Sequence, residues 1–122
     1  VVARRSTDTE AIENPHVAAA VRFIREHIDE VFGIDALVRH TSVSRRYLHY
    51  HFRRCLGCTP HQYINRARVA RAKKLLTEPK RHTLQQIACA CGFREPRRLR
   101  IVFRRVTGMT PAEYRRSLPK GR

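Results

Sequence analysis

The apolar residues of this chain recur at steps of three and four, the spacing that places them along one side of an α-helix. The clearest stripe consists of Val17, Val21, Ile24, Ile28 and Val31. It follows Asn14-Pro15, where asparagine can cap the first free amides and proline is tolerated in the first turn. We therefore expect a helix that begins at residue 15 and ends near Gly33.

A second and a third helix are predicted over residues 34–57. Apolar residues at 34, 37 and 38 indicate a short helix, and the hydroxyl side chains of residues 41–44 favour a turn after it. Ser44 can cap the next helix, in which Leu48, Phe52 and Leu56 face inward and Gly57 ends the helix. The pattern of this segment therefore predicts a helix-turn-helix.

The second half of the chain repeats this order. Thr59 and Thr110 each begin a capping box, with proline next and Gln or Glu three residues after the threonine. The first box opens a long helix through residues 63, 67, 70 and 75 to about Thr77, which spans about 27 Å. Thr83 caps a short helix with inward residues 84, 87 and 88, and a turn follows at Gly92.

The helix after that turn begins at Glu95-Pro96 and has Leu99, Phe103 and Val106 inward. Residues 97–114 match residues 46–63 at nine of eighteen positions. The alignment has an offset of 50 before the turn and 51 after it, so the second turn holds one extra residue. A repeated unit indicates a repeated structural task. We expect an all-α fold in which two helix-turn-helix units are joined by one long helix.

The charge of the chain points to a polyanionic partner. The 122 residues carry a formal net charge of +16, which favours nucleic acid first and an anionic membrane surface second. Residues 1–35 hold four basic and seven acidic residues, whereas residues 36–122 hold twenty-two and three. The binding surface is therefore expected after residue 35. No apolar run approaches the roughly 20 residues of a membrane span, so we expect a cytoplasmic, nucleoid-associated protein without a membrane partner.

The outward faces of the helices over 44–57 and 95–107 are rich in arginine. An α-helix fits the major groove of duplex DNA, where arginine can bond to guanine, and its first turns usually reach the bases. The residues expected at base edges are Arg45, Arg46, His49, Tyr50, Arg97, Arg98 and Arg100. Those expected at phosphates are Ser44, Arg53, Arg54, Arg104 and Arg105. One such face could be merely solvated, but two at matching positions favour DNA.

The long connecting helix fits that interpretation. Two helices that enter successive major grooves on one side of a duplex lie about 34 Å apart. A linker of about 27 Å could let one polypeptide occupy both grooves.

The motifs of the second half carry a family resemblance. Ile87-Ala88, Gly92-Phe93, Leu99, Phe103-Arg104-Arg105, Gly108, Thr110-Pro111 and Tyr114-Arg115 together resemble the signature of AraC/XylS-family transcription regulators. Arg68, Ala72 and Leu75-Leu76 resemble the linker helix of that family, so the likeness covers about residues 34–117. It implies a seven-helix DNA-binding domain with two helix-turn-helix subdomains, usually attached to an effector-sensing domain.

The resemblance also implies which positions contact bases. The matching residues are Arg45, Arg46, His49, Tyr50, Pro96, Arg97, Arg98, Arg100 and Ile101. Pro96 and Ile101 depart from the polar residues common in the family.

A narrower likeness lies near the start of the chain. Residues 12–17 and 23–27 resemble the start of this domain in regulators of xylose operons, where it follows a sugar-binding module. This implies a sugar-responsive activator with RNA polymerase as a partner, and a sugar effector that acts only through an upstream domain.

The expected organisation is a linker at 1–13, a first subdomain at 14–57, a linker helix at 58–78 and a second subdomain at 79–122. Because Val1 is not methionine, we expect a piece of a longer protein.

Three other interpretations of the sequence compete with DNA binding. Cys55, Cys58, Cys89 and Cys91 could form a four-thiolate zinc site. Cys55 and Cys58 align with valine and methionine across the repeat, however, which favours packing, so we predict no metal and no cofactor. No serine–histidine–aspartate set or carboxylate pair indicates an enzyme. Non-specific RNA binding remains the alternative, for which Tyr47 and Tyr50 are the plausible stacking platforms.

Overall fold

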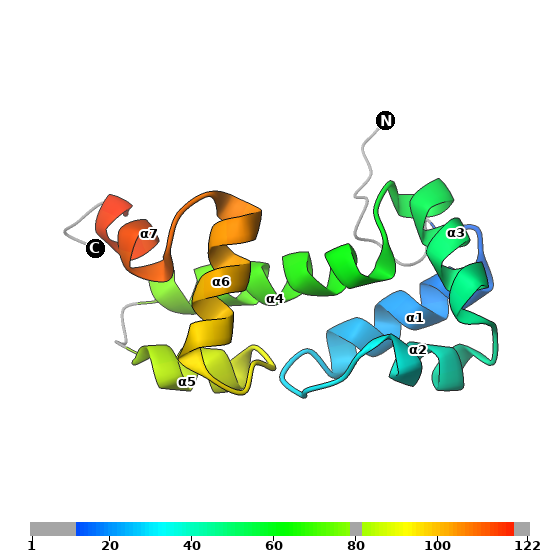
Figure 1. Ribbon diagram of the computed structural model, residues 1–122, viewed down its shortest axis with the longest axis horizontal. Coiled ribbons are helices and arrows are strands. Elements are labelled where there is room, and N and C mark those ends of the chain that lie inside the picture. The colour runs from blue at the N-terminus through cyan, green and yellow to red at the C-terminus, as the bar shows by residue number, and fades with distance from the viewer. Residues whose placement is uncertain (1–11, 79–81, 119–122) are drawn as a thin grey trace. The chain divides into compact units, whose positions relative to one another are not determined.

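The computed structural model describes residues 12–78 and 82–118. Most of the predicted linker, residues 1–11, and the start of the predicted second subdomain, residues 79–81, lie outside this part, as do residues 119–122. The described residues form seven α-helices and no strand, which confirms the all-α prediction (Figure 1). They are α1 Pro15–Glu26, α2 Ile34–Thr41, α3 Arg45–Leu56, α4 Pro60–Thr77, α5 Leu84–Ala90, α6 Pro96–Thr107 and α7 Pro111–Ser117.

The chain divides into two compact units. Unit 1 holds the described residues up to His27 together with Phe32–Ile64. Unit 2 holds Ile28–Val31 together with the described residues from Asn65 on. The division falls inside α4, so this helix contributes its first turn to the core of unit 1 and its remainder to the core of unit 2.

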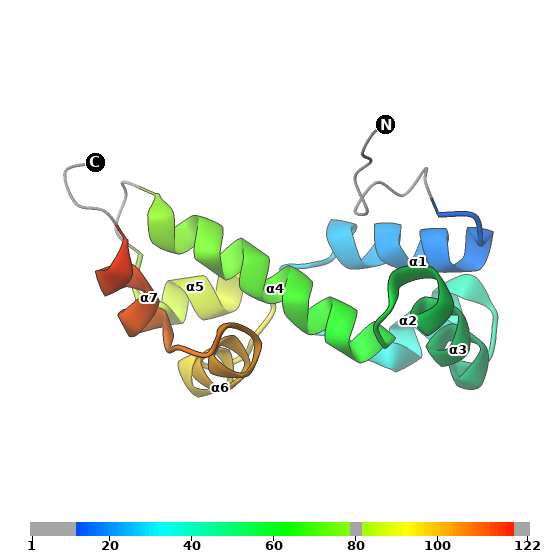
Figure 2. The same cartoon turned by 90° about the horizontal axis from the view of Figure 1, so that it is seen from above.

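Unit 1 is built from α1, α2 and α3, which pack against one another in both views (Figures 1 and 2). The side chain of Asn14 caps α1, since its oxygen accepts hydrogen bonds from the amides of His16 and Val17 at 2.8 and 3.2 Å. The apolar stripes of the three helices meet in the core, which includes Val17, Val21, Ile24, Leu37, Leu48 and Phe52. At these residues the apolar stripes predicted for α1 and α3 therefore face the core.

The first helix is shorter than its apolar pattern predicts. It ends at Glu26 and not near Gly33. Ile28 and Val31 continue the spacing of the stripe, yet they leave the helix, and Val31 is 54% exposed. Residues Ile28–Val31 instead belong to unit 2. Packing with residues distant in sequence thus overrides the local helical period.

Unit 2 places α5, α6 and α7 around the second part of α4 (Figures 1 and 2). Its core consists of Val69, Ala72, Leu76, Ile87, Ala88, Cys91, Phe93, Leu99, Val102 and Phe103. Val106, predicted to face inward, is 39% exposed because it lies in the last turn of α6, beyond the core.

The two units share an aromatic contact at equivalent positions. In unit 1 the rings of Phe52 and Tyr63 lie 5.9 Å apart at an interplanar angle of 71°. In unit 2 the rings of Phe103 and Tyr114 lie 5.5 Å apart at 67°. Edge-to-face packing of this kind is a favoured aromatic geometry. Each contact joins α3 or α6 to the first turn of the following helix, whose capping box fixes where that helix begins.

The two turns between helices also correspond. Ser42 and Gly92 lie 50 residues apart, and both adopt the left-handed conformation, with φ of 61° and 82°. Two residues separate Ser42 from the start of α3, whereas three separate Gly92 from the start of α6. The extra residue predicted for the second turn is therefore confirmed, and it follows the left-handed position.

Glycine is required at one of these turns for a second reason. A Cβ atom on Gly92 would lie 2.6 Å from the carbonyl oxygen of Ile28 and 2.7 Å from that of Glu30. Glu30 is also bound by Arg68 of α4, whose guanidinium donates to the Glu30 carbonyl at 3.0 Å. Arg68 is only 7% exposed and lies 5.7 Å from the centre of the Phe93 ring. Burial lowers the pKa of Arg68.

Replacing Gly92 with alanine is predicted to destabilise unit 2 by about 2–4 kcal/mol. About 1–2 kcal/mol comes from forcing an L-residue into the left-handed conformation, and the rest from collision with two backbone carbonyls that cannot turn aside. Urea denaturation followed by circular dichroism measures the loss.

The matched control is Gly108→Ala. Gly108 also has a left-handed φ of 87°, but a Cβ there meets no atom within 4 Å. The Gly108→Ala variant should therefore lose only the stability that the left-handed conformation costs an L-residue, about 1–2 kcal/mol. Equal losses in the two variants would show that the close approach to residues 28 and 30 does not matter.

Candidate nucleic-acid interface

Helix α3 is positioned by its cap and its buried stripe. The hydroxyl oxygen of Ser44 accepts a hydrogen bond from the amide of Tyr47 at 3.0 Å, and Gly57 ends the helix with φ of 76°. Leu48 and Phe52 are fully buried. Because these residues face the core, the opposite side of α3 must face solvent. The exposed residues include every base-edge candidate of this helix and both arginine phosphate candidates: Arg45, Arg46, His49, Tyr50, Arg53 and Arg54.

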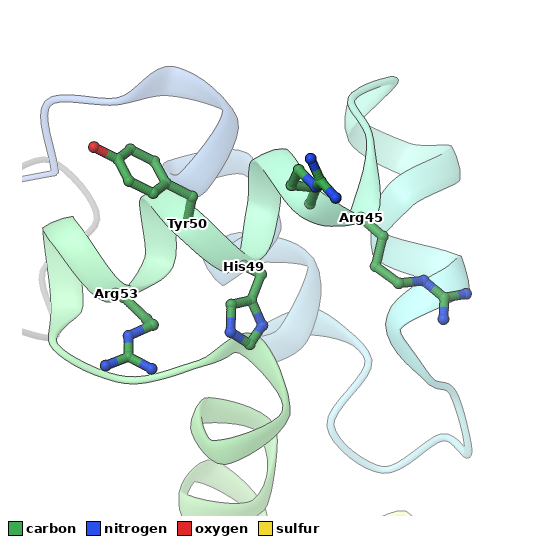
Figure 3. Close-up of a pocket in the computed structure, with 5 residues that line it drawn as sticks. Arg45, His49, Tyr50 and Arg53 are labelled. Atoms are coloured by element: carbon green, nitrogen blue, oxygen red, sulfur yellow. The ribbon is translucent and has the colours of Figure 1, made fainter.

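Five of these side chains line one pocket on the surface of α3. They are Arg45, Arg46, His49, Tyr50 and Arg53. Figure 3 shows Arg45 near one end of the helix and Arg53 toward the other, with His49 and Tyr50 between them. The surface combines guanidinium donors with an imidazole and a phenol, which suits hydrogen bonding to anions and to base edges.

Two of these side chains are held by neighbours. The guanidinium of Arg45 donates to the carboxylate of Asp35 on α2, in a pair exposed to solvent. The Tyr50 ring lies 5.9 Å from the guanidinium carbon of Arg54 and meets the ring of His51 edge-on at 5.0 Å. These contacts restrict where the two side chains point.

The other tyrosine of α3 has a structural role. Its hydroxyl accepts a hydrogen bond from the Asn14 side chain at 3.1 Å, and its ring meets His16 edge-on at 5.5 Å. The ring of His51 lies 4.1 Å away on the other side. Tyr47 therefore ties α3 to the start of α1 and is unsuited to serve as an open stacking platform.

Helix α6 presents the equivalent surface in unit 2. Proline occupies its first turn, and Leu99, Val102 and Phe103 are buried. The remaining side carries the predicted residues Arg97, Arg98, Arg100, Arg104 and Arg105, all exposed. α6 contains no acidic residue. Ile101 lies among these arginines and is 41% exposed. The family resemblance implies base contact at its position, whereas the pattern of the repeat assigns only arginines of this helix to DNA, although Ile101 aligns with Tyr50.

The cysteines do not gather into a metal site within the described chain. No group of three or more His, Cys, Asp or Glu residues there could hold a metal ion. Cys55 and Cys89 are exposed, whereas Cys58 and Cys91 are buried. Burial raises the pKa of the Cys91 thiol to about 11, although Arg71 and Arg68 oppose this shift.

Within residues 12–78 and 82–118, none of the helices combines the length and apolar character needed to cross a membrane.

A family model described as a helix-turn-helix domain matches residues 37–117, two thirds of the chain. A solved AraC-type DNA-binding domain from Chromobacterium violaceum is 30% identical with a TM-score of 0.75, and the match covers 88% of this chain and 96% of that one. This chain belongs to the AraC family of DNA-binding domains. The resemblance found in the sequence is thereby confirmed. The family and the fold are those of DNA-binding transcription regulators, which are not enzymes.

Two further relatives bear on what this AraC-family domain does. The DNA-binding domain of AdpA, solved with a target DNA, is 37% identical with a TM-score of 0.75, covering 83% of this chain and 90% of that one. The xylose operon regulatory protein of Escherichia coli strain K12 is 30% identical over 94% of this chain and 29% of its own length. The chain spans less than half the length of the curated relatives it matches first.

The burial of the cysteines predicts their reactivity. Iodoacetamide at pH 8 should label Cys55 and Cys89 of the folded domain within minutes. Cys58 and Cys91 should react only after denaturation, because they are inaccessible and the raised pKa of Cys91 leaves its thiol protonated. Mass spectrometry of peptides from native and denatured samples reads out each site. Rapid native labelling of Cys91 would contradict the packing of unit 2.

Proposed function

We propose that this AraC-family domain binds a specific duplex DNA sequence and regulates transcription by inserting α3 and α6 into successive major grooves. The observation that carries the proposal is the equivalence of the two helices. Each follows a helix and a turn, buries a leucine and a phenylalanine four residues apart, and exposes arginines on its other side. We call α3 and α6 the reading helices.

The roles of individual residues follow from their place along each helix. Residues of the first turns lie where a recognition helix usually meets base edges. This assigns Arg45, Arg46, His49 and Tyr50 of α3, and Arg97, Arg98 and Arg100 of α6, to bases. The last turns and the helix cap are assigned to phosphates, through Ser44, Arg53, Arg54, Arg104 and Arg105.

Reading of two grooves is supported by the length of α4. Its 18 residues form one continuous helix, about 27 Å long. Successive major grooves on one side of a duplex are about 34 Å apart. One chain with a reading helix before α4 and another after it could therefore occupy both grooves without dimerising.

The wider role is proposed from the relatives. The similarity to a xylose operon regulatory protein supports a sugar-responsive activator that works in the cytoplasm with RNA polymerase. In this proposal a sugar acts through an upstream domain joined by residues 1–13. The first subdomain is 14–57, the linker helix 58–78 and the second subdomain 79–122.

The test is a selection from a random duplex library at about 150 mM salt, near physiological ionic strength. Two enriched elements about 10 base pairs apart would support reading of both grooves. Retention without any enriched sequence, and equal competition by structured RNA, would favour the alternative of non-specific RNA binding. The engagement of Tyr47 with Asn14 and His16 already leaves that alternative with few stacking surfaces.

Alanine substitution should separate base contacts from phosphate contacts. Arg97→Ala is predicted to weaken binding to the selected sequence by about 1–3 kcal/mol and to relax preference at one base pair. Arg104→Ala should weaken binding to selected and scrambled duplexes alike. Fluorescence anisotropy on both duplexes measures the difference, and Arg25→Ala, an exposed arginine of α1, is the control. Equal losses on both duplexes for Arg97→Ala would contradict its assignment to a base.

Binding should depend steeply on salt. If the domain neutralises roughly eight phosphates, the slope of log affinity against log salt concentration is about −7. Removing one phosphate contact with Arg105→Ala should reduce that slope by about one. A titration between 50 and 300 mM salt gives both slopes. A slope near zero would show that the arginines are not neutralising phosphates.

A further inference from the structure

Large apolar side chains are exposed at only four places in the described residues: Val31, Tyr50, Ile101 and Val106. Two of the four, Tyr50 and Ile101, lie 51 residues apart, at the same position of the repeat and on the two reading helices. They are 54% and 41% exposed. The repeat thus places an apolar group at one equivalent surface position in each unit.

Each of these side chains lies between two arginines on the surface of its helix. Ile101 follows Arg97 by four residues and precedes Arg104 by three. Residues three and four apart are neighbours on one helix face, so the isoleucine lies midway along a row that is otherwise cationic. Tyr50 has the same relation to Arg46 and Arg53, and all three line one pocket (Figure 3).

The surroundings of Ile101 are unsuited to a protein partner. Surfaces that bind proteins usually expose contiguous apolar area of several hundred Å². Here a single isoleucine is surrounded by guanidinium groups that must stay hydrated or meet anions. The partner should therefore present a small apolar group within a strongly anionic surface.

Duplex DNA offers such a group. In the major groove the C5-methyl of thymine projects beside the acceptors and donors of the base edges, with phosphates on both sides. An arginine on the same helix face can bond to a guanine while an apolar side chain one turn away packs on a thymine methyl.

We infer that Ile101 contacts the C5-methyl of a thymine, and that Tyr50 makes the equivalent contact in the other half of the site. The inference rests on the proposed function. It means that each half-site contains a thymine close to the base met by Arg97 or by Arg46. Ile101 thus contributes to sequence specificity in addition to the base contacts of the arginines.

The test uses the sequence obtained by selection. Each thymine is replaced singly by deoxyuridine, which keeps the base pair and removes only the methyl group. Arg97→Ala identifies the half-site that α6 contacts. At one thymine of that half-site, replacement by deoxyuridine should weaken binding of the unaltered domain about fourfold, the value of one buried methyl-sized group. Ile101→Ala should bind the thymine duplex less well and lose this discrimination. Tyr50→Ala should do the same in the other half-site.

Val106→Ala is the matched control. Val106 is also an exposed apolar residue of α6, but it continues the inward stripe of Leu99 and Phe103. This variant should keep the fourfold preference for thymine over uracil. Circular dichroism verifies that the variants fold, which is expected since the altered side chains are exposed.

The outcomes separate this inference from the proposed function. A selected sequence in which no uracil substitution changes affinity would overturn the contact with thymine while the proposed function stands. Unchanged discrimination in Ile101→Ala would overturn it as well. The absence of any selected sequence would remove the proposed function, and this inference with it.

Discussion

Both units depend on the packing of a phenylalanine in the reading helix against a tyrosine in the next helix. Burial of such a phenylalanine contributes roughly 1.5–3 kcal/mol, and an edge-to-face aromatic pair adds roughly 0.5–1.5 kcal/mol. With Phe52 or Phe103 fixed inward, the rotation of the reading helix about its axis is fixed too. Residues two positions before each phenylalanine and one after it must then face outward. The core contact therefore selects the side chains that can meet DNA.

Unit 2 adds a second constraint at its turn. Gly92 approaches the carbonyl oxygens of residues 28 and 30 so closely that no side chain fits, and the buried guanidinium of Arg68 donates to the second of them. A buried arginine is tolerable only when its charge and donors are compensated, here by that carbonyl and by the face of Phe93. Ser42 occupies the matching left-handed position in unit 1, where a small polar residue suffices.

Local signals in the sequence predict the helices well, because capping boxes and apolar periods act within a few residues. The threonine caps at 59, 83 and 110 begin helices as expected. The end of α1 was predicted wrongly, since residues 28–31 continue an apolar period but belong to unit 2, where the carbonyl of Glu30 accepts a hydrogen bond from Arg68, 38 residues away. The family resemblance places Arg68 in the linker helix, but no local signal in the sequence predicts that its side chain is buried. The outward faces of α3 and α6 could be predicted because the buried apolar stripe on the opposite side of each helix recurs in both halves of the chain.

The shared scaffold carries unequal surfaces. The outward side of α6 has five arginines, one isoleucine and no acid, whereas that of α3 has four arginines, one of them engaged by Asp35, with a histidine and a tyrosine. Arginines give charge and guanine contacts, while rings and hydroxyls discriminate by shape and by single hydrogen bonds. α6 should thus supply more of the salt-dependent affinity than α3. The base preference of α3 should differ from that of α6. Two unequal reading helices in one chain fit an asymmetric operator better than a palindrome, since palindromic sites reflect two-fold symmetry in the protein.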